Sequence, residues 1–127
     1  MRLLTLCALV VLTLVATPPL SAHHSFAAEY DSKAPLTLTG VVTKVEWTNP
    51  HTYVYIDVKE DGKTVNWAFE GYPPNTLKRT GFSRDSVKAG TTITITGWNA
   101  RLGAKRAAGR EITLPDGSKL FLGPNAQ

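Results

Sequence analysis

The sequence has 127 residues, with 14 lysines and arginines, 10 aspartates and glutamates, and a single cysteine. This length allows one small domain behind a leader, and one cysteine excludes a disulfide framework. The formal net charge of +4 is mild and the charges are interspersed, so no dedicated nucleic-acid surface is indicated.

The first 22 residues are typical of a cleaved signal peptide. A positive second residue, an apolar run over residues 3–16 and a stretch of breakers and small residues give the expected three parts. A membrane anchor is the alternative, but a span needs about 20 apolar residues and Pro18 ends the run early. We therefore expect an exported, periplasmic chain that begins at His23, with cleavage after Ala27 or Ala28 left open.

Removal of the leader leaves 105 of the 127 residues, with 13 basic and 10 acidic side chains. Cys7 lies within the leader, so the mature chain can form no disulfide and its stability must come from a core. The mature chain opens with residues 23–31, and Ser32–Pro35 is predicted to be a loop.

Residues 40–70 predict three consecutive β-strands, because apolar and polar side chains alternate with a period of two. The first strand places on one face Val41, Val45 and Trp47. The second strand places on one face Thr52, Val54, Ile56 and Val58, and on the other His51, Tyr53, Tyr55 and Asp57. The third strand places on one face Val65, Trp67 and Phe69. Residues 60–63 predict a tight hairpin, and Pro50 predicts a bend between the first two strands.

The remaining elements are a short helix over residues 74–80 closed by Gly81, a strand over residues 91–96, a strand over residues 106–114 and a short strand over residues 119–122. Five main strands with one helix between the third and fourth is the element order of the OB-fold. We predict a mainly β chain, a small OB-like Greek-key barrel of five to six strands. A different small β-sandwich or open barrel is the alternative, and the lack of crossover helices excludes a parallel α/β fold.

We divide the chain into the signal peptide (residues 1–22), an N-terminal extended segment (residues 23–35) and the OB-like domain (residues 36–127). The start His23–Phe26, the segment Val45–His51, the strand Asn66–Glu70 and the hairpin Leu114–Gly117 resemble a group of small exported bacterial proteins, the domain-of-unknown-function family 6152. The resemblance covers nearly the whole mature chain. It implies a periplasmic protein, and it carries no established activity.

Two aromatic side chains and a basic hairpin are the candidate ligand-binding residues. Tyr53 and Tyr55 lie on the face opposite the aliphatic one, and the second and third strands form the usual binding surface of an OB-fold. They could stack a sugar, a base or another planar ligand. The alternative is that Phe26 and Tyr30 cover them and form a second small core. The candidate contacts for anions or acidic partners, in the hairpin between the fourth and fifth strands, are Arg101, Lys105 and Arg106.

The three histidines form the candidate metal site. Cleavage after residue 22 leaves His23 with a free amine, so the amine and the ring could chelate a metal together, as in a histidine brace. His24 and His51 could supply further nitrogen ligands, with copper as the candidate cofactor. The alternative is a frayed terminus beside a histidine that only caps a strand. The mature chain has neither cysteine nor methionine, which argues against Cu(I) trafficking.

No complete catalytic constellation is present. The candidate acids are Glu46, Asp57, Glu70 and Asp85, and the sequence pairs none of them with a base that would orient it. We therefore expect a non-enzymatic binding or accessory module of the periplasm, whose partner is a small ligand or another periplasmic protein. Nucleic acid is not indicated as a partner, and no membrane span is expected after cleavage. Copper or another divalent metal, bound by the histidines, is the alternative.

Overall fold

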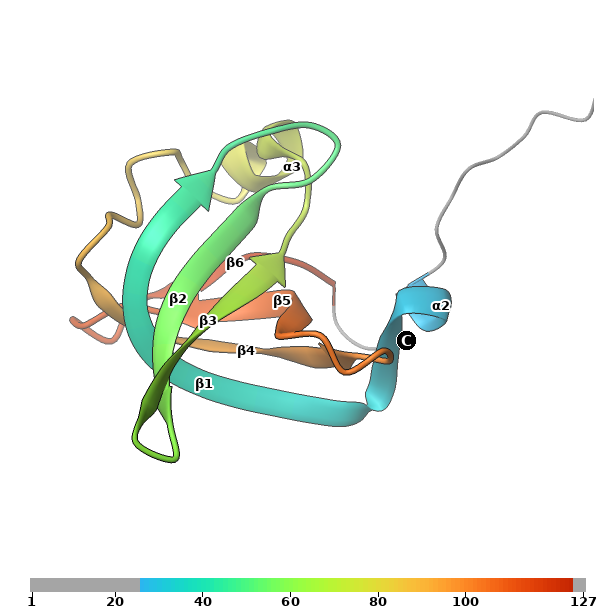
Figure 1. Cartoon of the computed structure of the whole chain (residues 1–127). Helices are drawn as coiled ribbons and strands as arrows, with labels where there is room; N and C mark the ends of the chain where they lie inside the picture. Colours follow the sequence, from blue (N-terminus) through green and yellow to red (C-terminus); the bar gives the residue numbers. More distant parts are fainter. Residues whose placement is uncertain (1–25, 125–127) are drawn as a thin grey trace, which may run out of the picture.

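Strands make up most of the chain that the structure describes, which is residues 26–124 of a computed structural model. The elements follow in the order α2 (Phe26–Glu29), β1 (Tyr30–Glu46), β2 (Tyr53–Glu60), β3 (Lys63–Glu70), α3 (Pro74–Arg79), β4 (Thr92–Ala100), β5 (Arg106–Thr113) and β6 (Lys119–Phe121). The prediction of a mainly β chain with one short helix between its third and fourth strands is confirmed (Figure 1).

The six strands form one sheet in the order β3-β2-β1-β4-β5-β6, and neighbours in this order are antiparallel. β1 is long enough to serve two partners: its first half lies beside β4 and its second half beside β2 (Figure 1). An additional parallel pairing joins Ala68–Glu70 of β3 to Arg106–Ala108 of β5. This pairing brings the end of β3 next to the start of β5.

β1 departs from the sequence prediction in two ways. Residues 32–35 lie inside the strand, where a loop was predicted. Between Val42 and Lys44 the register shifts, so that Thr43 has no partner residue on β2. Such a bulge reverses which side chains face inward. Val42 is therefore buried and Val41 is 42% exposed, so the prediction for Val41 is wrong, whereas Val45 packs against the core as expected.

β2 and β3 follow the predicted alternation, and their inward side chains form the middle of the core. Val54, Ile56 and Phe69 are completely buried. The two strands meet at the predicted tight turn, where Asp61 and Gly62 both have positive φ angles, of 48° and 77°. Two consecutive positive φ angles match the twist of a β-hairpin and fix the register of the strands.

α3 closes one end of this core. Leu77 of the helix is completely buried, and Phe82, which follows the helix, packs against Trp47 with ring centroids 5.6 Å apart. Gly81 has a φ of 86°, a conformation that glycine adopts without cost, and this fits its predicted place after the helix. Within residues 26–124, no helix is long and apolar enough to cross a membrane.

Candidate functional site

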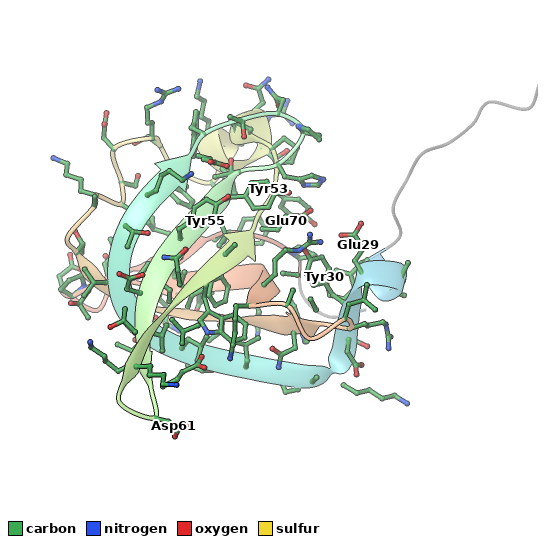
Figure 2. The ribbon with its side chains drawn as sticks, viewed as in Figure 1. Glu29, Tyr30, Tyr53, Tyr55, Asp61 and Glu70 are labelled. Carbon is green, nitrogen blue, oxygen red and sulfur yellow. The ribbon has the colours of Figure 1, made fainter. Side chains whose placement is uncertain are left out.

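The two predicted tyrosines lie side by side on the outer face of β2. Their neighbours along the strand point into the core, so strand alternation turns Tyr53 and Tyr55 outward. The ring centroids are 6.3 Å apart and the ring planes are inclined by 35° (Figure 2). Both side chains are only half-buried. Together they present an aromatic surface that is open to solvent.

Tyr55 is held in place by its neighbours on β1. Its hydroxyl donates a hydrogen bond of 3.1 Å to Glu46 Oε2, and Lys44 Nζ lies 4.5 Å from the centre of its ring. Lys44 and Glu46 also form an ion pair of 2.5 Å. Burial and the hydrogen bond to Glu46 raise the pKa of Tyr55. Tyr55 is therefore the fixed member of the aromatic pair.

Tyr53 is the freer member, and it borders a group of charged residues. Its hydroxyl makes no hydrogen bond to any residue of the described range 26–124. It is directly opposite Glu70 in the register of β2 and β3, so the two side chains lie on the same face. Burial, followed by the negative charge of Glu70, raises the pKa of Tyr53. Tyr53 thus has a hydroxyl that can donate to a ligand beside a carboxylate.

Glu70 is the centre of the charged group, and its side chain is only 14% exposed. The Tyr30 hydroxyl donates a hydrogen bond to Glu70 Oε2, and Arg106 Nη2 lies 4.0 Å from the same oxygen. His51 Nδ1 lies 3.3 Å from Glu70 Oε1. Burial and the contact with Glu70 raise the pKa of Tyr30. Figure 2 shows Tyr53 and Glu70 together above β2 and β3, with Tyr30 and Glu29 continuing toward α2.

Arg106 connects this group to the N-terminal helix. Its Nη2 donates to Glu29 Oε2 at 2.8 Å, and its guanidinium carbon lies 5.6 Å from the centre of the Tyr30 ring. Its Nε is buried and has no partner among residues 26–124. Between Arg106 and Tyr55 the sheet carries only Ala68, which pairs with both. Only the small side chain of Ala68 therefore lies between the Tyr55 ring and the Arg106 side chain on this face of the sheet.

A second small core exists, but it does not cover the predicted tyrosines. Tyr30 and Trp98 are buried together with Ala108, and the Phe26 ring packs against both aromatic rings at 5.5 and 5.7 Å. The interpretation that Phe26 and Tyr30 cover Tyr53 and Tyr55 is wrong, because Phe26 and Tyr30 pack with Trp98 instead. The aromatic pair on β2 consequently keeps its exposed surface.

The basic hairpin is paired with acids from distant parts of the chain. Lys105 Nζ lies 2.6 Å from Glu60 Oε2, and Arg101 Nη2 lies 3.9 Å from Asp31 Oδ1. Arg101 Nε also donates to the carbonyl oxygen of Ala27 at 2.7 Å. With Arg106 bound to Glu29, each of the three predicted cations has a carboxylate partner. Binding of an external anion by this hairpin stays a prediction, and such an anion would compete with those carboxylates.

Of the three predicted metal ligands, only His51 is in the described part of the chain; His23 and His24 lie outside it. His51 Nδ1 is 3.2 Å from the carbonyl oxygen of Gly71 and 3.3 Å from Glu70 Oε1. Both neighbours accept hydrogen bonds and cannot donate them, so the neutral ring carries its proton on Nδ1. Nε2 then bears the free lone pair. Residues 26–124 contain no group of three or more histidines, cysteines or acids placed to hold a metal.

Sequence reasoning missed how Glu70 is surrounded. Its place opposite Tyr53 could have been found, because the two residues are equally far from the Asp61–Gly62 turn. Tyr30 and Arg106 could not, since they reach Glu70 through β1–β4 and β3–β5 pairings between distant segments.

Comparison with known proteins gives a family and no activity. The model of a family of unknown function (DUF6152) matches residues 10–109. No curated protein matches the chain. The resemblance seen in the sequence is therefore confirmed over residues 10–109, which do not include the hairpin Leu114–Gly117. The family supplies no function.

Proposed function

Since the chain belongs to the DUF6152 family, whose function is unknown, we propose from the site alone that it is an exported, non-enzymatic binding module that holds a sugar on the outer face of β2 and β3. The observation that carries the proposal is the open aromatic pair, Tyr53 and Tyr55, beside the charged group centred on Glu70. The signal peptide predicted over residues 1–22 supports export to the periplasm.

We assign the fold to the OB-like barrels. The parallel pairing of β3 with β5 supports this, because it joins the first and fifth strands of the order β3-β2-β1-β4-β5. Barrels of this type bind oligosaccharides and oligonucleotides on the face of their second and third strands. That face carries Tyr53 and Tyr55 here.

A sugar fits the chemistry of this face better than a nucleic acid. Sugar rings stack their C–H groups on aromatic side chains, and their hydroxyls bond to carboxylates, guanidinium groups and phenols. Tyr53, Glu70 and Arg106 offer those groups next to the aromatic surface. A phosphate backbone would require uncompensated cations, whereas here Arg106 and Lys44 are each paired with a carboxylate.

The test is a titration of the purified protein with cello-, chito- and maltotetraose, followed by NMR. We expect one of the three to give saturable shifts at Tyr53, Ala68 and Glu70. Tyr53→Ala is expected to weaken binding by roughly tenfold or more, the usual effect of removing an aromatic stacking contact. Phe121→Ala, which removes an exposed ring from a different strand, is the matched control and should leave the affinity unchanged.

Two results would contradict this proposal. One is the absence of saturable shifts with all three sugars. The other is binding that survives both Tyr53→Ala and Tyr55→Ala, since it would then lie elsewhere on the molecule.

A second candidate function, binding of copper or another divalent metal, rests on the orientation of His51. Metal-binding histidines usually donate the proton of the second ring nitrogen to a carbonyl or a carboxylate, and His51 Nδ1 has both within 3.3 Å. Its Nε2 is left to bind a metal, and its side chain is 44% exposed. The terminal amine, His23 and His24 would supply the other ligands.

This candidate is tested by calorimetry with Cu(II) and Zn(II) on a chain that begins at His23. Equimolar binding is expected, and it should weaken both in His51→Ala and in a variant with one glycine ahead of His23. The glycine leaves every side chain in place and displaces only the amine. Affinity no greater than that of a peptide with the same N-terminal residues would remove the metal site and leave the sugar proposal untouched.

A further inference from the structure

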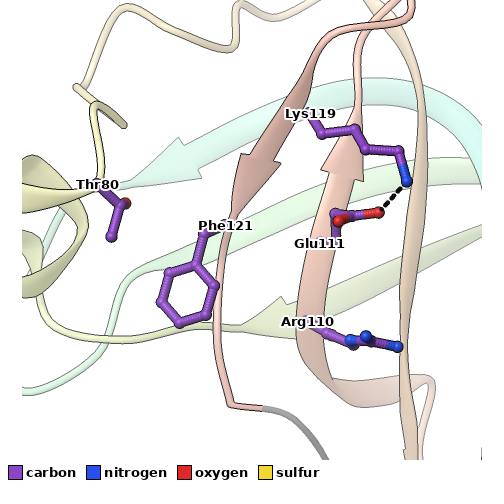
Figure 3. A pocket seen from close by; sticks show the side chains of 5 residues that line it. All are labelled: Thr80, Arg110, Glu111, Lys119 and Phe121. Atoms are coloured by element: carbon purple, nitrogen blue, oxygen red, sulfur yellow. Dashed lines mark hydrogen bonds and ion pairs between the residues drawn. The ribbon is translucent and has the colours of Figure 1, made fainter.

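A groove lies on another part of the molecule, between the end of α3 and the strands β5 and β6 (Figure 3). Its volume is about 410 Å³, and its lining residues are Thr80, Arg110, Glu111, Lys119 and Phe121. Small-molecule sites in proteins fall in this size range and combine an apolar wall with a few polar groups. None of the five residues belongs to the tyrosine face, so the groove needs an explanation of its own.

Phe121 provides the apolar wall of the groove. Phe121 is 37% exposed, although it belongs to the strand β6. The ring does not swing freely, because it packs on Tyr72 with ring centroids 5.5 Å apart, and Tyr72 in turn packs on the main core. The groove therefore contains an aromatic surface that is held in position and left open on one side.

Arg110 gives the groove a net positive charge. Lys119 Nζ donates to Glu111 Oε1 at 2.8 Å, so these two charges compensate each other (Figure 3). Arg110 is exposed and forms no ion pair with any residue of the range 26–124. A guanidinium group without an acid partner can bind a carboxylate or a phosphate with two parallel hydrogen bonds.

The end of α3 and the segment that follows it carry further exposed cations outside the groove. The four cations that follow the middle of α3 are Lys78, Arg79, Arg84 and Lys88, and the same stretch contains one acid, Asp85. All five are exposed, and none of them takes part in an ion pair within the described chain. Such surface charge attracts anions toward the molecule from a distance, whereas the affinity of the groove itself depends on the cation that lines it, Arg110. The basic hairpin differs, because carboxylates already neutralise its cations.

We propose that this groove binds an organic anion, a carboxylate or phosphate group on a small apolar body. Arg110 holds the anionic group and Phe121 contacts the apolar part, while the paired Lys119 and Glu111 form the polar side. The site is independent of the sugar-binding proposal. One chain would then carry two ligand sites on different strands.

The experiment is an NMR titration of the purified protein with phenyl phosphate, with inorganic phosphate as the second probe. We expect saturable shifts at Arg110 and Phe121, and tighter binding of phenyl phosphate than of inorganic phosphate. Arg110→Gln should weaken both ligands by roughly tenfold or more, since it removes charge-assisted hydrogen bonds. Phe121→Ala should weaken phenyl phosphate alone, and Arg84→Gln, which removes an unpaired cation outside the groove, should change neither.

Sedimentation with vesicles that contain an anionic phospholipid separates the two sources of a phosphate. Co-sedimentation that is lost in Arg110→Gln and kept in Arg84→Gln would identify the anion as a lipid headgroup. Soluble binding without co-sedimentation would identify a free metabolite. The proposal is overturned when neither probe gives saturable shifts and vesicles are not bound, or when Arg84→Gln and Arg110→Gln weaken binding equally, which would mean diffuse attraction by surface charge.

Discussion

The two basic regions of this protein look alike in the sequence and differ completely in the structure. The hairpin cations Arg101, Lys105 and Arg106 each lie against a carboxylate. Arg110, which is only four residues further along the chain, has no such partner among residues 26–124. The hairpin cations therefore act inside the protein, where they tie β4 and β5 to α2, β1 and β2. Arg110 is available to something outside it.

The aromatic residues near the two regions differ in the same way. Trp98, near the end of β4 that leads into the hairpin, is 6% exposed and lies in the small core with Tyr30 and Phe26. Phe121, in the groove, is 37% exposed. The aromatic side chain near the hairpin is thus buried and stabilises the fold, whereas the one in the groove is exposed. The number of cations in a region therefore does not show whether they pair with acids of the protein or are available to a ligand.

The largest expected change in the free energy of unfolding comes from replacing the aromatic residues. Trp98→Ala should lower the free energy of unfolding by about 3–5 kcal/mol, because it empties the small core on which Phe26 packs. Phe121→Ala should cost less than about 1.5 kcal/mol in the free energy of unfolding, since Phe121 is already 37% exposed. Urea unfolding of both variants measures the difference. Equal losses in free energy would mean that Phe121 contributes as much to the stability of the fold as Trp98 does.

The next effect concerns the cations. Arg106→Met keeps the apolar stem and removes the guanidinium beside Glu29 and Glu70. We expect a loss of about 1–2 kcal/mol in the free energy of unfolding, as for other hydrogen bonds to charged groups. Arg110→Met should stay within about 0.5 kcal/mol of the parent protein. A similar loss in both variants would contradict the absence of an ion pair at Arg110 within residues 26–124.

The sequence predicts this fold well where the strands are regular. The faces of β2 and β3 and the hairpin at Asp61 and Gly62 follow from alternation and turn chemistry, which are local. Which side chains of β1 face inward does not follow from alternation, because the bulge at Thr43 depends on how the strand bends between its partners β4 and β2. Local patterns carry no sign of such a bend.

The site is less predictable than the fold for a related reason. Tyr53 and Tyr55 could be placed on an outer face from the period of β2 alone. Whether Phe26 and Tyr30 cover them depends on Trp98, which comes from a strand almost seventy residues further along the chain than Tyr30. The ion pairs of the hairpin likewise join residues 45 to 77 positions apart. Contacts at these separations are set by the pairing of strands and cannot be read from neighbouring residues.

The Tyr30 hydroxyl provides a pH-dependent test of the hairpin end. Its pKa is raised by burial and by the hydrogen bond to Glu70, so the folded protein holds this proton more tightly than the unfolded chain. The resulting stability is fully present below about pH 10, the ordinary tyrosine pKa, and is lost as the pH rises above that value. Tyr30→Phe should cost about 1 kcal/mol at neutral pH.

The same variant should also unfold with a shallower pH dependence in alkali. Some dependence remains, because the pKa values of Tyr53 and Tyr55 are raised as well. Urea midpoints between pH 7 and about pH 11, compared with those of Tyr72→Phe, whose ring packs on Phe121, measure the change. Parallel pH profiles for the parent protein and Tyr30→Phe would show that the Glu70 group does not hold the Tyr30 proton.

The smallest expected effect concerns Lys105, and it tests whether this exposed hairpin cation interacts with Glu60 in solution. The hydrogen bond from Lys105, followed by that from the Trp67 indole, lowers the pKa of Glu60. A lowered pKa stabilises the folded state above the ordinary glutamate pKa, and this contribution disappears as the pH falls through the lowered value. Lys105→Met should therefore raise the Glu60 pKa toward its ordinary value, as measured by carboxyl NMR. Lys59→Met, which removes a cation from the opposite face of β2, should leave the Glu60 pKa unchanged. If both variants gave the same Glu60 pKa, Lys105 would be as free as Arg110, and the contrast between the two basic regions would then rest on Arg101 and Arg106 alone.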